Sequence, residues 1–228
     1  MKRLTLDQLP AHIPTPQELY SELMKAPGWP YKTNREIFKA RDLALPSILY
    51  LGALRVSEAI PLIKEQFSDP IEDDRGEYIL IKNVKLSKRR FHKLETNDLP
   101  LPLEGERAKF TQLIQDYLFM LDDKERLFPW SLEQKKIQIK DPKWDYKLKT
   151  GEIRHRYSYR MAGTARAYQI VKCLLPSITE HWLRAFGEDF FYVLSGKDLV
   201  ATASHYKVDA RTLAEWYLKR RHLEVKIR

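Results

Sequence analysis

The sequence predicts an α+β fold that is mostly α-helical and contains a small antiparallel sheet. Three capping-box patterns mark helix starts: Thr15-Pro16-Gln17-Glu18, Thr33-Asn34-Arg35-Glu36 and Ser177-Ile178-Thr179-Glu180. Tyr78-Ile79-Leu80-Ile81 is a strand candidate between turn signals, and residues 91–103 are predicted to return beside it. Of the 228 residues, 43% are hydrophobic, which is enough for one main domain with a full core.

The helices follow from the spacing of apolar side chains along the chain. The first starts at Pro16 and ends near Lys25, and the second starts near Glu36 and has Pro46 inside it or at its end. Residues 47–54 are almost wholly apolar and are expected to be buried. Further helices are expected over residues 56–60, 104–121, 160–174 and 210–221, and the helix after Glu180 is expected to stop at Ser195-Gly196.

The charge balance favours a polyanionic partner. There are 40 Lys and Arg residues against 31 Asp and Glu, a net charge of +9, and the positive side chains gather at residues 82–93, 135–172 and 219–228. A basic surface that is merely solvated is the alternative. The single Cys173 excludes an internal disulfide and a cysteine-based zinc site. No apolar run approaches the roughly 20 residues that a membrane helix needs, so a cytoplasmic protein with no membrane partner is expected.

Two arginines are candidates for binding an anion. His181 and Arg184 are three residues apart near the start of a helix, so both can reach one small anionic group such as a phosphate. Arg55 ends the buried apolar run, and a guanidinium in that position must be paired or directed at a ligand. The structural alternative for both arginines is an ion pair, with Glu58 or Glu188 as the partners.

Two basic stretches are candidates for contact with a nucleic acid. Residues 85–90 form a lysine-rich turn between the two predicted strands, which suits a DNA-facing hairpin but also an ordinary soluble hairpin tip. Residues 141–159 interleave basic and aromatic side chains without a clear period, as in a segment along a phosphate backbone or a long surface loop.

Several segments together resemble the catalytic domain of the tyrosine recombinases, the phage-integrase type of site-specific recombinase. Residues 52–59, Gly-Ala-Leu-Arg-Val-Ser-Glu-Ala, resemble the first arginine box of that family. Residues 85–90 followed by Leu99-Pro100-Leu101 resemble its lysine hairpin, and residues 181–186 resemble its HxLR box. His205 and Tyr217 fall near the positions of its last histidine and its nucleophile. The resemblance covers roughly residues 35–221, and it implies the fold of that catalytic domain.

The resemblance implies a chemistry for each matched residue. Tyr217 attacks a DNA phosphodiester, which gives a 3'-phosphotyrosyl link and a free 5'-hydroxyl. Arg55 and Arg184 clamp the non-bridging oxygens, and Lys85 protonates the leaving 5'-oxygen, with Lys82 as the alternative acid. His181 assists proton transfer from the tyrosine and His205 bonds a phosphate oxygen. Neither a metal nor another cofactor is implied. The side chains expected to contact DNA are Lys82, Lys88, Arg89, Arg90, Arg154, Arg156 and Arg160.

The expected organisation is an N-terminal helical extension over residues 1–34 and a catalytic domain with a C-terminal tail over residues 35–228. The implied partner is double-stranded DNA, bound by a homotetramer in a nucleoid-associated location.

Tyr206 is the alternative nucleophile. The twelve positions from His205 to Tyr217 are more than is usual in the family, and Ser204-His205 replaces the usual Gly-His pair. The resemblance implies that the tail docks on a neighbouring protomer, and the apolar residues at 223, 225 and 227 suit pairing with a sheet edge; a frayed basic terminus is the alternative. Two other classes remain open: a DNA-binding relative without catalysis, and an enzyme of the type IB topoisomerase kind.

Overall fold

A computed structural model describes residues 14–25, 36–74, 76–87, 94–122, 126–128, 146–147, 153–154, 164–206, 210–211 and 213–214. Its helices are α1 (Pro16–Met24), α2 (Glu36–Leu51), α3 (Val56–Ala59), α4 (Ala108–Phe119), α5 (Thr164–Leu174), α6 (Glu180–Leu194) and α7 (Leu199–His205), with a 3-10 turn η2 (Lys64–Gln66). The strands are β1 (Ile71–Asp73), β2 (Gly76–Ser87), β3 (Leu94–Pro102), β4 (Tyr146–Lys147) and β5 (Ile153–Arg154). The predicted α+β class, mostly helical with a small antiparallel sheet, is confirmed. None of the helices in these ranges has the length and apolar character needed to cross a bilayer.

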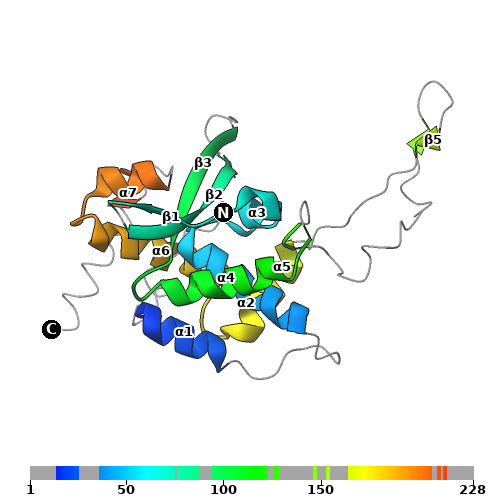
Figure 1. Ribbon diagram of the computed structural model, residues 1–228, viewed down its shortest axis with the longest axis horizontal. Coiled ribbons are helices and arrows are strands. Elements are labelled where there is room, and N and C mark those ends of the chain that lie inside the picture. The colour runs from blue at the N-terminus through cyan, green and yellow to red at the C-terminus, as the bar shows by residue number, and fades with distance from the viewer. Residues whose placement is uncertain are drawn as a thin grey trace.

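The sheet has the order β1-β2-β3 with antiparallel neighbours. The two strands expected around Tyr78 and over residues 91–103 are confirmed as β2 and β3. Their register shifts between Ile81 and Val84, where Asn83 has φ of +53° and its backbone N–H donates to the carboxylate of Asp98 at 2.8 Å. In Figure 1 this sheet lies on one side of α1, α2 and α4, and α7 lies beyond one end of it.

Helix α2 is the centre of the core and contacts α3, α4, α5 and α6. It runs through Pro46 to Leu51, so the proline lies inside the helix and does not end it. Next to it, the Ser47 hydroxyl donates to the Leu43 carbonyl, one turn earlier, at 2.8 Å. The predicted burial of residues 47–54 is confirmed. Burying this continuous apolar segment draws the following loop, which carries Arg55, towards the interior.

Two of the predicted capping boxes can be compared with the structure. At α1, the Thr15 hydroxyl accepts from the Glu18 backbone N–H at 3.2 Å, and the Glu18 carboxylate accepts from the Thr15 N–H at 2.7 Å, which confirms the prediction. At α6 the expected cap at Ser177 is wrong, because Thr179 caps the helix and accepts from the backbone N–H of Trp182 at 3.4 Å. The remaining box over residues 33–36 falls mostly outside the described residues.

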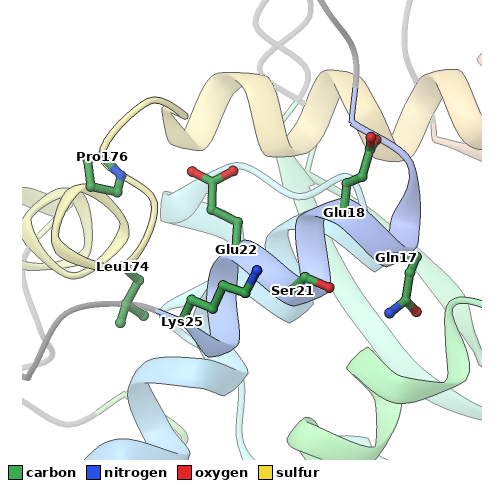
Figure 2. A pocket seen from close by; sticks show the side chains of 7 residues that line it. All are labelled: Gln17, Glu18, Ser21, Glu22, Lys25, Leu174 and Pro176. Carbon is green, nitrogen blue, oxygen red and sulfur yellow. The ribbon is translucent and has the colours of Figure 1, made fainter.

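Ser177 has a tertiary partner in place of the expected capping role. Its hydroxyl donates to Glu22 of α1 at 2.8 Å, which ties the α5–α6 turn to α1. Figure 2 shows the pocket beside this contact, where α1 side chains face Leu174 and Pro176. Leu19 and Leu23, on the inner side of α1, belong to the same apolar cluster as the buried residues of α2. Helix α1 is therefore part of the core of the chain.

The contact between α6 and the end of α2 is very close at Gly187. A Cβ atom added to Gly187 would lie 2.0 Å from the backbone oxygen of Tyr50. Only glycine allows the two helix backbones to approach so closely, because every other residue places a carbon atom in that space. This contact fixes where α6 packs along α2. It thereby also fixes the position of Arg184, three residues before Gly187.

Candidate active site

Arg55 and Arg184 line the same small pocket, although they come from different parts of the chain. Arg55 lies at the N-terminus of α3, directly after the turn in which Ala53 has φ of +47°. Arg184 lies in the second turn of α6. The other lining residues are Gly52, Ala53, Leu54, Glu58, Leu86, Leu99 and Tyr206. The free space is about 10 Å³, which is room for about one water molecule.

Each arginine is paired with a glutamate on its own helix. Arg55 Nη1 lies 2.9 Å from Glu58 Oε1, and the Glu58 Oε2 accepts from the backbone N–H of Arg55 at 2.8 Å. Arg184 Nε donates to Glu188 Oε1 at 2.8 Å. These are the partners anticipated by the ion-pair alternative. The side chains of Arg55 and Arg184 keep 32% and 15% of their surface exposed, whereas Glu58 and Glu188 keep 5% and 12%.

The Glu188 carboxyl, which is bound to Arg184, has a perturbed pKa. Burial raises its pKa, and the guanidinium of Arg184 opposes that rise through its charge and its hydrogen bond. Arg55 also lowers the pKa, and the negative charge of Glu58 raises it further. Two guanidinium groups and two carboxylates therefore form one charged cluster, of which Arg55, Glu58 and Arg184 line the pocket and Glu188 lies behind Arg184, and their formal charges cancel.

His181 does not line this pocket. Its side chain is half exposed, and its Nε2 lies 3.5 Å from the carboxylate of Glu180. One helix face can hold both His181 and Arg184, as the spacing predicts, but the packing of α6 turns Arg184 inward and leaves His181 in solvent.

His205 and Tyr206, the two candidate residues at the end of α7, line one apolar cavity together, and of the two it is Tyr206 that also lines the arginine pocket. The His205 ring stacks on Phe191 at 4.1 Å with an angle of 7° between the rings, and it lines a cavity that does not contain Arg55 or Arg184. Tyr206 lines the arginine pocket but is buried, and its hydroxyl donates to the backbone oxygen of Gly187 at 3.1 Å. Burial raises the pKa of Tyr206, which makes its phenol a poorer nucleophile.

The hairpin residues expected to contact DNA start on β2, next to a residue that lines the arginine pocket. Leu86 lines the pocket, while Lys85 next to it is exposed on the opposite face of β2, and Lys82 is exposed as well. Lys88, Arg89, Arg90, Arg156, Arg160 and Tyr217 lie outside the described residues. Arg154 belongs to β5, where the structure describes the backbone.

Arg107 is a buried arginine that the sequence analysis missed. Its Nη2 donates to the backbone oxygen of Leu51 at 3.0 Å, and its guanidinium lies over the rings of Tyr50 at 5.0 Å and Phe190 at 4.8 Å. It thereby links α2, α4 and α6 just before the turn that carries Arg55. The sequence offered no signal for this, since Glu104-Gly105-Glu106-Arg107 looks like a solvated helix start.

Larger pockets lie outside the arginine pocket. One, of about 620 Å³, has apolar walls that include Tyr78, Phe190 and Phe191. Another is the pocket of about 460 Å³ beside α1 that Figure 2 shows. Within the described part of the chain, no group of three or more His, Cys, Asp or Glu side chains is arranged to hold a metal ion.

No protein-family model and no curated protein matches the chain. Among solved structures, the chain is similar to the XerH site-specific recombinase bound to its difH substrate in a pre-cleavage complex, at 17% sequence identity and a TM-score of 0.49. The match covers 90% of this chain and 49% of that chain, so this chain spans about half the length of that recombinase.

Proposed function

We propose that the chain is a site-specific recombinase that cuts and rejoins DNA strands through a 3'-phosphotyrosyl intermediate. The observation that carries this proposal is the convergence of Arg55 and Arg184, from α3 and α6, on one pocket. Guanidinium groups hold phosphate oxygens through paired N–H donors and stabilise the charge that develops on a phosphorus centre under attack. Motifs that resemble those of tyrosine recombinases support the same chemistry, since both arginines lie in them.

In the proposed reaction the Tyr217 hydroxyl oxygen attacks the phosphorus of a DNA phosphodiester. A phosphorus–oxygen bond to the tyrosine forms while the bond to the 5'-oxygen breaks, so the number of phosphoester bonds is conserved. The tyrosine proton passes to His181, His205 bonds a phosphate oxygen, and the 5'-oxygen takes a proton from Lys85. Arg55 and Arg184 hold the non-bridging oxygens throughout. Attack by a free 5'-hydroxyl of another strand reverses these steps and joins the strands.

Double-stranded DNA is the proposed partner, bound as a homotetramer by residues 35–228. The net charge of +9 supports a polyanion, and the exposed Lys82 and Lys85 on β2 can be reached by a duplex from solvent. Phosphate contacts release counterions, so the affinity for DNA should fall steeply with salt concentration.

The proposal is tested by a search for a covalent protein–DNA adduct on denaturing gels. The protein is incubated with DNA from its own genetic context, as wild type and as the variants Tyr217→Phe, Tyr206→Phe and Arg184→Lys. We expect an adduct with wild type and with Tyr206→Phe, none with Tyr217→Phe, and a strong reduction with Arg184→Lys, because lysine cannot form the paired contact. An adduct that persists in Tyr217→Phe and disappears in Tyr206→Phe would move the nucleophile to Tyr206.

A DNA-binding protein without catalysis is the second candidate. The observation that favours it is that both arginines are paired with glutamates, while His181, His205 and Lys85 lie outside their pocket. This candidate predicts a salt-dependent gel shift on duplex DNA and no adduct with any of the four proteins. The same gels therefore separate the two candidates.

A further inference from the structure

Glu188 stands out beside the arginine pocket because it is a buried carboxylate bound to Arg184, whose guanidinium, under the proposed function, must hold a phosphate. Only 12% of its side-chain surface is exposed, so water solvates it little. Arg184 Nε, at 2.8 Å, provides its charge partner. The other carboxylate, Glu58, is anchored differently, since one of its oxygens accepts from the backbone N–H of Arg55. Glu58 therefore keeps a donor even if the Arg55 guanidinium turns to another ligand.

The pocket as it stands has no room for a phosphate. Its free space of about 10 Å³ accepts about one water molecule. A phosphate that uses the donors of Arg184 must compete with Glu188 for the same guanidinium. If Glu188 stays charged, three anionic groups (Glu58, Glu188 and the phosphate) face two guanidinium groups. A buried carboxylate that loses its cation is strongly unfavourable, and such a group takes up a proton instead.

We propose that Glu188 is the counter-ion of Arg184 in the absence of DNA and takes up one proton when a DNA phosphate binds to Arg184. This inference rests on the proposed function, since it assumes that the arginine pocket holds a phosphate. The proton makes the cluster neutral again: two guanidinium cations, the Glu58 carboxylate and the phosphodiester. Glu188 thereby couples occupation of the site to pH and keeps Arg184 paired until a phosphate arrives.

The groups that face Glu188 are consistent with this role. Arg184 lies on α6, the same helix as Glu188. Arg55 and Glu58 come from α3, and the Tyr206 phenol comes from the end of α7. Burial already raises the pKa of the Glu188 carboxyl, against the opposing effect of Arg184 and Arg55. A phosphate adds one more negative charge and draws the guanidinium away. Both changes raise the pKa of Glu188 further, so the DNA complex binds a proton more tightly than the free protein does.

The expected consequence is a defined pH dependence of phosphate binding. Between the pKa of Glu188 in the free protein and its pKa in the complex, the affinity falls by up to about tenfold for each unit rise in pH. The variant Glu188→Gln keeps an oxygen that can accept from Arg184 Nε but carries no charge. It should bind DNA independently of this proton, and at pH 8 at least about tenfold more tightly than wild type, because a neighbouring negative charge is removed.

The experiment is calorimetric titration of the full chain with a short DNA duplex, at fixed ionic strength and in two buffers with different enthalpies of ionisation. The difference between the buffers gives the number of protons taken up on binding. We expect wild type to take up as much as one proton more than Glu188→Gln. The control Glu65→Gln, which removes the same charge at an exposed site in η2, should take up as many protons as wild type.

The outcomes separate this inference from the proposed function. Equal proton uptake by wild type and Glu188→Gln would overturn the role of Glu188. If Arg184→Lys then still strongly reduces the covalent adduct, the recombinase proposal stands without it; if Arg184→Lys changes neither adduct nor affinity, both proposals fail. Folding of each variant is checked by thermal unfolding. The double variant Arg184→Gln/Glu188→Gln, which removes the whole ion pair, provides a second folded reference and should lack the extra proton.

Discussion

Replacement of Gly187 by alanine should destabilise the protein and displace Arg184. At an open position in a helix, Gly→Ala stabilises by about 1 kcal/mol. At Gly187 the new Cβ would lie 2.0 Å from the Tyr50 backbone oxygen, while real contacts of this kind begin at 3.0 Å or more. Helices α6 and α2 must therefore separate by about 1 Å, and backbone atoms cannot rotate out of the way as a side chain does.

The magnitude follows from these opposing effects. Overpacking of a well-packed interior costs about 1–3 kcal/mol, and more where the obstacle is rigid. Because the obstacle at Gly187 is a backbone oxygen, we take a cost of about 3–4 kcal/mol, and subtraction of the gain of about 1 kcal/mol in helix propensity leaves a net loss of about 2–3 kcal/mol in the free energy of unfolding. In a chain of 228 residues, each kcal/mol corresponds to roughly 2–4 °C, so Tm should fall by about 5–10 °C.

The assay is thermal unfolding followed by circular dichroism, with Gly196→Ala as the control. Gly196 has φ of +71° and open space around its Cβ position, so alanine there costs about 1–2 kcal/mol of backbone strain without a collision. The adduct assay adds a second readout, because a shift of about 1 Å in a catalytic group can reduce the rate about 100-fold. An unchanged or raised Tm for Gly187→Ala would refute the close contact between α6 and α2.

Three further outcomes are expected. Tyr117→Phe removes the hydrogen bond from a buried hydroxyl to the Leu127 backbone oxygen and should lower the free energy of unfolding in urea by about 1–2 kcal/mol; no change would contradict that bond. Burial raises the pKa of Asp42 from 3.8 to about 6 against the opposing charge of Arg41. The stability that this carboxyl contributes is therefore complete below its unfolded-state pKa and is lost as pH rises through about 6. The free energy of unfolding of Asp42→Asn, measured relative to wild type, should therefore rise by up to about 3 kcal/mol from acidic to neutral pH. Finally, a plot of log affinity for duplex DNA against log salt concentration should have a clearly negative slope, which each lost phosphate contact reduces by about 0.9; a flat plot would argue against any DNA-binding function.

Features that depend on neighbours in the sequence were open to prediction from the sequence. The capping box at Thr15 and the stop at Ser195-Gly196 are confirmed, because the hydrogen bonds at a helix end join residues a few positions apart. The ion pairs of Arg55 with Glu58 and of Arg184 with Glu188 join positions three and four apart on one helix, so their partners could be named in advance.

The composition of the site was decided by the tertiary structure. That Arg55 and Arg184 meet depends on how α6 packs on α2, and this packing depends on the close contact at Gly187. The same packing leaves His181 in solvent and places the His205 ring on Phe191, although both residues fit the sequence motifs equally well. A motif records residue types and their spacing, whereas the direction of each side chain is set by contacts with distant segments. The sequence by itself therefore determined the fold class and the local ion pairs, and only the packing of distant helices decided which charged side chains share a pocket.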